Sequence, residues 1–596
     1  MTALANDLPV WDMTPIFPSL ASEEFVAEFE ALCAGIETLA ALFDTHNVNR
    51  RLESSVDAAF VAQYEEIIEK TSALQQRLRA VSSYIGCFVT TDARDDAARS
   101  RESLLSARSV RLQKLYTRLV AWVGTTDTEA LLAASGVARD LEYNVRRAAE
   151  QAKHQMSPVE EDLASELQSP GISGWVKLHA NLTAMLNVPL TVDGETKSLP
   201  MSAVRSLATD SRREVRKAAF EAEIAAWAET AMPLAAALNG VKGYQQVVRK
   251  RRGYANDIEP TLSANGIDAE TLEAMHTACV ESFPDFRRYM NAKAKALGVE
   301  KLEWYDVSAP LGEEGKSWSW SEAETFVETN FARYSHRLAG FARMNFTENW
   351  IDAGQRVGKV GGAYCTGLRP GESRILMNYN GSFNSVSTLA HELGHAYHNL
   401  NLKERKSMQR ATPATLAETA SIFCETLAFD GALASADNSE RLVLLDTVLE
   451  RNLMVVVDIH SRFLFEKSVF AKRQEREITV AEFKELMTTA QQQTYGDALN
   501  STHPFMWAVK GHYYNSGFYN YPYTFGLLFG LGLYARFQAS PDEFRADYDD
   551  FLSSTGMYDA HTLAARFGID THSVEFWRSS LDVIRIQIGE FDQLIG

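Results

Sequence analysis

The pattern of apolar positions in the first two hundred residues predicts helices. Amphipathic stretches run through Leu104–Val123 and Leu141–Gln155, with apolar residues at the spacing that favours one buried helix face. The clearest example has apolar residues at alternating spacings of four and three, which gives one apolar stripe: Phe25, Phe29, Leu32, Ile36 and Leu39.

Two polar clusters predict helix starts. Ser157 is followed by Pro158 and then Glu160, which indicates a capped first turn and a capping box. Ser211 and Glu214 have the same spacing and predict a second capping box, at the start of another helix. The short, polar segment Thr191–Pro200 is the expected boundary between an N-terminal helical region, 1–195, and a second region, 196–596.

The pattern changes after residue 350. Gly354–Gly371 holds six glycines and Pro370, a density that a helix does not easily accommodate. Arg374–Tyr379 then reads as a short strand, and Asn380-Gly381 as a turn that leads into a helix. Farther on, Phe525–Leu533 is the longest apolar stretch; it is too short to cross a bilayer and predicts a buried helix.

Composition narrows the class of protein. The chain has 596 residues, 46% of them hydrophobic, with a formal net charge of −19 and five scattered cysteines. The acidic balance disfavours nucleic acid as a partner, since phosphate binding requires a basic face. The cysteines contain no CxxC pair, which favours a reducing compartment. No signal peptide is evident at the N-terminus, so we expect a cytoplasmic protein without a membrane partner.

The candidate chemistry lies in His391-Glu392-Leu393-Gly394-His395, an HExxH motif in a helical stretch. Positions four apart differ by about 40° around a helix axis, so both imidazoles project from one face. Two imidazole nitrogens there could bind one zinc ion, with Glu392 placed to take a proton from a bound water. The alternative is a surface helix in which the two histidines occur by chance.

A catalytic zinc ion usually has three protein ligands, and the following segment offers the third. Glu418 and Glu425 are seven apart in an apolar, helix-like stretch, so they share a face. One could bind zinc and the other could accept the remaining N–H of a ligating histidine. The alternative is that both are ordinary exposed glutamates. His398, three residues after His395, could be a fourth ligand, but a supporting role fits better with Glu418 completing the set.

Residues 512–523 are rich in groups that could stabilise an oxyanion. They read His-Tyr-Tyr-Asn-Ser-Gly-Phe-Tyr-Asn-Tyr-Pro-Tyr. A tyrosine hydroxyl or a histidine N–H near zinc could bind the developing charge. The alternative is an aromatic core segment, because tyrosines often pack with only one end in water.

These residues together resemble the thimet oligopeptidase and oligoendopeptidase F family of zinc peptidases. The resemblance is closer to the oligoendopeptidase F branch. It rests on HELGH, on Glu418-xx-Ser421-xxx-Glu425 and on the His-Tyr-rich segment. Further likenesses cover most of the chain: Trp11–Pro18, Arg249–Tyr254 and Gly358–Cys365.

The resemblance implies a mainly α, elongated, two-lobed molecule with a deep substrate channel and a small β-sheet beside the HExxH helix. It makes 196–596 the catalytic region. It implies one zinc ion on His391, His395 and Glu418, with Glu392 as general base and Glu425 supporting the metal. Short peptides are the expected substrates.

The resemblance also assigns roles in the C-terminal segment. His512 matches the family's transition-state histidine, and Tyr521 is the best match for its oxyanion tyrosine. Tyr514 and Tyr519 are weaker candidates. The spacing of this segment differs from that of the thimet branch, which leaves the choice among the three tyrosines open. The strand at Arg374–Tyr379 could pair by its edge with an extended peptide. The rival interpretations are a zinc peptidase of another helical family, a zinc-stabilised peptide-binding scaffold, and a scaffold without metal.

Overall fold

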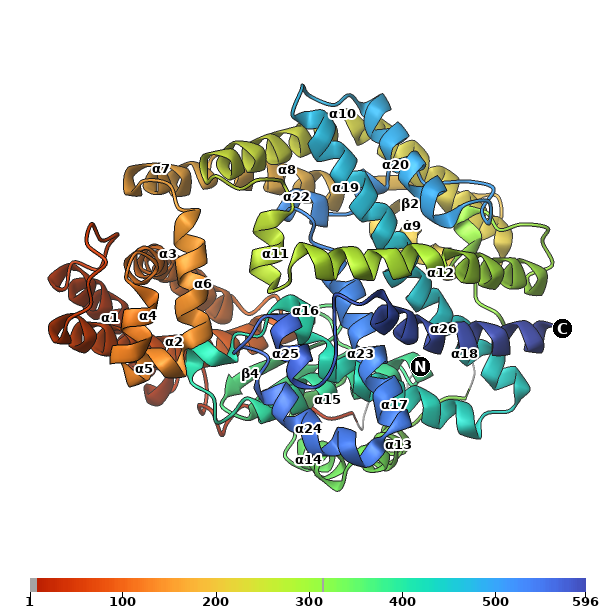
Figure 1. Ribbon diagram of the computed structural model, residues 1–596. Helices are drawn as coiled ribbons and strands as arrows, with labels where there is room; N and C mark the ends of the chain where they lie inside the picture. Colours follow the sequence, from red (N-terminus) through yellow and green to blue (C-terminus); the bar gives the residue numbers. More distant parts are fainter. Residues whose placement is uncertain (1–7, 313–315) are drawn as a thin grey trace. The chain divides into compact units, whose positions relative to one another are not determined.

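The computed structural model describes residues 8–312 and 316–596, most of which lie in helices (Figure 1). The mainly α fold expected from the sequence is therefore confirmed. The chain divides into two compact units, and each is built from three separate segments. Unit 1 consists of 1–155, 316–432 and 536–568, and unit 2 of 156–315, 433–535 and 569–596.

The helices of each unit are as follows. Unit 1 contains α1 (Glu23–Thr45), α2 (Ala58–Thr91), α3 (Asp96–Gly124), α4 (Thr128–Ala134), α5 (Gly136–Asp140), α6 (Glu142–Lys153), α13 (Trp320–Tyr334), α14 (His336–Thr347), α15 (Phe383–Asn401), α16 (Ala414–Ala417), α24 (Pro541–Ser553), α25 (Ala560–Arg566) and most of α17 (Thr419–Ser435). Unit 2 contains α7 (Pro158–Gln168), α8 (Ile172–Ala184), α9 (Met201–Ser206), α10 (Arg213–Arg251), α11 (Glu259–Asn265), α12 (Ala269–Ala296), α18 (Asn438–Leu453), α19 (Ile459–Arg473), α20 (Val480–Tyr495), α21 (Met506–Val509), α22 (His512–Asn515), α26 (Val574–Ile595) and most of α23 (Tyr521–Ala539).

The apolar stripes predicted from the sequence form the core of unit 1. All five stripe residues of α1 are buried, and they belong to one cluster with residues of α2 and α3. Ser22 caps the start of α1: its side chain accepts from the Phe25 N–H, which satisfies one of the free amides of the first turn. The cap at Ser22 thus accounts for where α1 begins, and burial of its apolar stripe accounts for how it packs.

A three-stranded sheet supports the HExxH helix in unit 1. Its order is β3 (Ile351–Asp352), β5 (Glu372–Leu376) and β4 (Tyr364–Arg369). β5 pairs antiparallel with β4 and parallel with β3, and α15 packs against β4 and β5. The expected sheet beside this helix is confirmed. The idea that a peptide pairs with the edge of the Arg374–Tyr379 strand is wrong for β5, because both of its edges are already paired.

In unit 2 a hairpin follows α8, where the sequence predicts only a boundary. β1 (Asn187–Val192) and β2 (Glu195–Pro200) pair antiparallel around Asp193-Gly194. Both turn residues have positive φ, 53° and 79°, as a tight two-residue hairpin turn requires. The boundary between 1–195 and 196–596 stays a prediction. The two compact units are made of alternating segments of the chain, so their limits describe a different division.

The two capping predictions have different outcomes. Ser157 and Glu160 form the expected capping box at the start of α7. α10 instead begins after Arg212 without a side-chain cap, so the second capping prediction is wrong. Phe525–Leu533 lies in α23, as expected, with every residue from Phe525 to Leu533 buried. Among the described helices, none is both long enough and apolar enough to cross a membrane.

Candidate metal centre

The HExxH motif lies in the middle of α15, which the sequence positions by a cap and a close contact. Ser382 caps the helix by accepting from the Ser385 N–H. Gly394 lies against the start of α17: a Cβ at this position would come within 2.6 Å of the Ala420 carbonyl oxygen and the Ser421 Cα. Glycine at the fourth position of the motif therefore lets the backbones of α15 and α17 approach each other.

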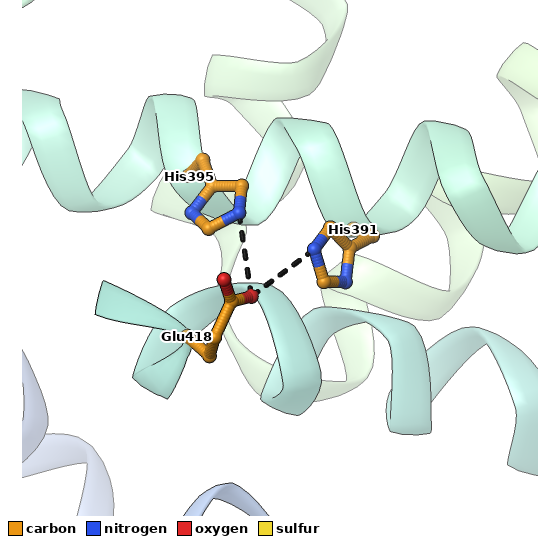
Figure 2. A group of neighbouring side chains, drawn as sticks. All are labelled: His391, His395 and Glu418. Carbon is orange, nitrogen blue, oxygen red and sulfur yellow. Dashed lines mark ion pairs between the residues drawn. The ribbon is translucent and has the colours of Figure 1, made fainter. Parts of the chain in front are cut away.

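This approach brings Glu418 to the two histidines of the motif (Figure 2). Glu418 lies between α16 and α17, and its Oε2 is 3.2 Å from His391 Nε2 and 3.4 Å from His395 Nε2. The two rings are 4.9 Å apart and nearly perpendicular. One ligand atom from each residue lies within 4.8 Å of the other two.

The spacing of these atoms fits a bound metal ion. Zinc bonds to nitrogen and oxygen are about 2.0–2.1 Å long, so two ligands of a tetrahedral zinc ion are about 3.3 Å apart. The separations of 3.2 and 3.4 Å match that edge. Two imidazoles and one carboxylate are also a ligand set that catalytic zinc sites use.

Glu425 lies beside His391, on the side of the ring away from Glu418. Its Oε2 lies 3.1 Å from His391 Nδ1, and its Oε1 accepts a hydrogen bond from Ser387 Oγ at 3.0 Å. A carboxylate acceptor places the imidazole proton on Nδ1, so the lone pair of Nε2 points to Glu418. Two acceptors then face each other, and a cation between them removes their repulsion. Ser421 Oγ donates to Glu418 Oε2 at 2.8 Å and holds this carboxylate in place.

The pKa shifts keep two of these groups deprotonated at neutral pH. Burial lowers the pKa of His395 to about 4, helped by the neighbouring His391. Burial opposes ionisation of Glu418, but its close contacts with His391 and His395 outweigh burial and lower its pKa to about 2. A neutral imidazole and an ionised carboxylate are the forms that bind metal.

Two other residues of α15 flank the cluster. Glu392 is buried, with 5% of its surface exposed, and follows the first histidine directly. His398 is also buried, and its Nε2 hydrogen-bonds with Thr555 Oγ1 at 2.8 Å. His398 is outside the group of converging ligand atoms found among the described residues, which favours the supporting role over a fourth ligand.

Comparison with known proteins gives the family. The sequence model of a family described as Peptidase family M3 matches residues 206–583, more than half of the chain. The chain belongs to peptidase family M3. It is a metallopeptidase and an oligoendopeptidase homologue, as the resemblance implied.

Several relatives of this M3 peptidase match over nearly their whole length. The group B oligopeptidase PepB of Streptococcus agalactiae is 24% identical, covering 98% of this chain and 97% of the relative. An oligoendopeptidase F homologue of Lactococcus lactis is 22% identical over the same shares. The structure of oligoendopeptidase-F from Enterococcus faecium matches with a TM-score of 0.70 at 16% identity, covering 96% of this chain and 99% of that one. The structural match confirms the fold.

The predicted oxyanion residues belong to unit 2, and their surroundings differ. His512, in α22, stacks on Tyr519 with ring centroids 4.6 Å apart. Tyr514 is fully buried: its ring stacks on His179 and its hydroxyl donates to the Leu234 carbonyl at 3.3 Å. This environment favours packing over contact with substrate.

The other tyrosines of the C-terminal segment also differ in exposure. Tyr521 is 1% exposed, and its hydroxyl lies 3.2 Å from Asn265 Nδ2. Burial raises its pKa to about 12. Tyr519 and Tyr523 are 42% and 40% exposed, and the Tyr523 hydroxyl donates to that of Tyr519. Accessibility therefore favours Tyr519 over Tyr514, while the roles of all these tyrosines stay predictions.

Sequence reasoning missed the role of Gly394. The motif HELGH attracts attention to its histidines and glutamate, but the glycine permits the contact that brings Glu418 into place. The available signal is a glycine inside an otherwise strong helix, which carries a cost unless another element packs closely against it.

Proposed function

We propose that this M3 peptidase is a zinc-dependent endopeptidase that hydrolyses short oligopeptides. His391, His395 and Glu418 would hold one zinc ion, and Glu392 would act as general base. The observation that carries the proposal is the convergence of two imidazole nitrogens on one carboxylate oxygen at 3.2 and 3.4 Å.

Each of these residues has a defined task in the proposed reaction. A zinc ion, when bound, supplies Lewis acidity that polarises a carbonyl group and acidifies water. The Glu392 carboxylate takes a proton from the attacking water and passes it to the leaving amine, which general acid–base catalysis requires within one cycle. Burial of Glu392 keeps competing bulk water away from this proton.

Glu425 and Ser387 orient the first ligand. Their contacts hold the His391 ring and its proton in one arrangement, so little reorganisation is needed when metal binds. The role is structural for the site and does not require contact with substrate.

His512 is proposed to stabilise the oxyanion, with Tyr521 as the tyrosine that the family pattern favours. Burial and the positive charge of Arg462 lower the pKa of His512, so at neutral pH the ring is uncharged and retains one N–H to donate. Tyr519 is the alternative tyrosine, because its hydroxyl is accessible and its ring stacks on His512. Tyr514 is the weakest of the three, because its hydroxyl is occupied by the Leu234 carbonyl.

The substrate class follows from the relatives. Their names describe oligopeptidases and oligoendopeptidases, and we extend short peptide substrates to this chain. A two-lobed shape with a deep channel, and a cytoplasmic location, stay predictions.

The test is cleavage of peptides with and without a chelator. Products of a mixed peptide library would be identified by mass spectrometry, and unfolded casein would be offered separately. We expect internal cleavage of short peptides that the chelator abolishes and added zinc restores, with casein degraded far more slowly. Cleavage that persists in the chelator would contradict the metal assignment, and casein degraded as fast as peptides would favour a peptidase of larger proteins.

His512 is tested in the same assay. His512→Gln should lower kcat by about tenfold or more with a smaller change in KM, because an oxyanion donor acts mainly in the transition state. Unchanged kcat would remove His512 from the proposed mechanism.

A further inference from the structure

A cavity of about 820 Å³ lies within unit 2, bounded by α11, α12 and α19. Its volume is in the range of sites that bind small molecules or peptide segments. Most of its wall is apolar, with Leu272 from α12, Phe463 and Phe470 from α19, and Phe518 from the segment after α22. Such a wall fits an apolar group better than a charged one.

Two histidines lie in this wall, and the lining also includes the charged residues Asp257, Glu273, Glu281 and Lys467. His276 of α12 and His460 of α19 both line the cavity, and their rings are 4.7 Å apart at 73°. His460 is only 6% exposed, and its Nδ1 is buried without a hydrogen-bond partner among the described residues. A buried polar atom without a partner costs about 1–3 kcal/mol, so its persistence here requires an explanation.

The environment of the two rings keeps them neutral. Burial lowers the pKa of His460 to about 4, and burial also lowers the pKa of His276. The other ring neighbours of His460 are Phe283 and Phe463. A neutral imidazole has one N–H and one acceptor nitrogen, so the pair offers hydrogen bonds to an uncharged polar group without attracting an ion.

One wall of the cavity is formed by Phe518, which lies in the segment that carries the predicted oxyanion residues. Phe518 has a positive φ of 49°, which is uncommon for a residue with a bulky side chain. Its ring stacks on Phe470 at 5.3 Å and also contacts Phe463. The next residue, Tyr519, stacks on His512. A group bound in the cavity would therefore contact Phe518, whose backbone continues directly to Tyr519 and so to the ring stacked on His512.

We propose that this cavity binds an aromatic side chain of a peptide that carries a hydrogen-bonding group, as tyrosine and tryptophan do. The aromatic ring would contact Phe463, Phe470 and Phe518, and its polar atom would reach the His276–His460 pair. The proposal rests on the proposed function, because it makes the cavity a specificity site for peptides. The volume leaves room for the neighbouring backbone as well as one side chain.

The first experiment measures binding to a filled cavity. Ala471 lines the cavity but is exposed, so the larger side chain in Ala471→Trp occupies the cavity without disturbing the packing of the buried core. Ala296→Trp, at an exposed position of α12 outside the cavity wall, is the matched control. The probes are three fluorescein-labelled octapeptides that differ only in one central residue: tyrosine, phenylalanine or alanine. All variants carry Glu392→Gln in the zinc-loaded chain, so that the peptides stay intact.

We expect the tyrosine peptide to bind about tenfold or more tightly than the alanine peptide, since burying an aromatic side chain contributes that much. Ala471→Trp should remove this preference, and Ala296→Trp should keep it. Equal affinity of the Ala471→Trp and parent chains for the tyrosine peptide overturns the proposal.

The second experiment tests the two histidines. In the parent chain the tyrosine peptide should bind about fivefold more tightly than the phenylalanine peptide, the effect of one hydrogen bond. His460→Phe should remove this difference and keep the preference for an aromatic residue over alanine. A difference that survives in His460→Phe overturns the hydrogen-bond part, and if this variant does not fold, Ala471→Trp decides the proposal alone.

Cleavage is measured separately with the active chain. If no peptide is cleaved while the tyrosine preference and its loss in Ala471→Trp remain, only the proposed function fails. If peptides are cleaved but the preference is absent or insensitive to Ala471→Trp, only the cavity proposal fails.

Discussion

Two pairs of histidines in this protein have similar ring geometry and different surroundings. The rings of His391 and His395 are 4.9 Å apart at 83°, and those of His276 and His460 are 4.7 Å apart at 73°. The first pair contacts Glu418, and His391 also contacts Glu425. The second pair lies in a largely apolar cavity, and no carboxylate joins it in a group of converging ligand atoms among the described residues.

The difference shows that the carboxylates, rather than the spacing of the rings, determine the chemistry. Carboxylates near the first pair supply negative charge and fix the tautomer, as metal binding requires. Without a carboxylate in the group, two neutral imidazoles are better suited to hydrogen bonds with an uncharged group.

The largest effect is expected from removing the general base beside the first pair. Glu392→Gln should lower kcat by about a hundredfold to ten-thousandfold, the usual contribution of a positioned base, while one zinc ion per chain is retained. Steady-state kinetics with a quenched peptide and metal analysis check both parts. Glu404→Gln, at an exposed glutamate after α15, is the control. Parent-like turnover by Glu392→Gln would sink the general-base assignment.

The second pair should give the protein a pH-dependent stability. Burial lowers the pKa of His460 from 6.5 to about 4, so between these values the unfolded chain binds more protons than the folded one. The free energy of unfolding therefore rises with pH through this window, by roughly 3 kcal/mol for this residue, and the contribution is lost as pH falls toward 4.

Urea unfolding at several pH values measures this slope. His460→Phe should flatten the rise between pH 4 and 6.5, and His336→Gln, at an exposed histidine, should leave it unchanged. A slope that is the same in His460→Phe and the parent would mean that this ring is not the source.

Weakening the carboxylate behind the first pair should have an intermediate effect. Glu425→Gln keeps the shape of the side chain but replaces the charged acceptor of His391 Nδ1. Zinc affinity should fall by about tenfold to a hundredfold, as for other residues that orient a metal ligand. Competition with a chromogenic chelator measures the affinity, with Glu300→Gln as an exposed control. An unchanged affinity would show that Glu425 does not tune the site.

The smallest effect is expected at Tyr514. Tyr514→Phe removes one hydrogen bond to the Leu234 carbonyl and should lower the free energy of unfolding by about 1 kcal/mol, with little change in kcat. Tyr521→Phe and Tyr519→Phe in the same assay show which hydroxyl contributes to turnover. A large loss of kcat in Tyr514→Phe, with stability unchanged, would reverse the order of these candidates.

Short-range patterns in the sequence predicted the local structure well. The α1 stripe, the Ser157–Glu160 capping box and the strand after the glycine-rich segment depend on neighbours within a few residues. The bounds of the strand were less exact: β5 spans Glu372–Leu376, whereas the prediction was Arg374–Tyr379. The β1–β2 hairpin was missed although Asp193-Gly194 is a strong turn signal and β1 alternates Val188, Leu190 and Val192 with other residues. Its partner β2 is polar and almost fully exposed, so it gives no alternating pattern. The second capping box failed because α10 begins at Arg213, one residue later than a cap at Ser211 would allow.

Contacts between distant segments were harder to predict. The HExxH spacing indicates that His391 and His395 share a helix face, but no pattern shows that β5 is the central strand of its sheet. The cavity at His276 and His460 joins helices almost two hundred residues apart in sequence, and two isolated histidines give no sequence signal. The segmented composition of the two units likewise depends on packing between segments far apart in the chain.

Zinc content of the purified chain tests the central claim most directly. After dialysis against metal-free buffer, elemental analysis would compare the parent with Glu418→Ala and with Glu348→Ala, a control at an exposed glutamate. The account predicts one zinc ion per chain in the parent and the control and far less than one in Glu418→Ala. A parent chain without zinc, or a Glu418→Ala chain that retains a full equivalent, would contradict it.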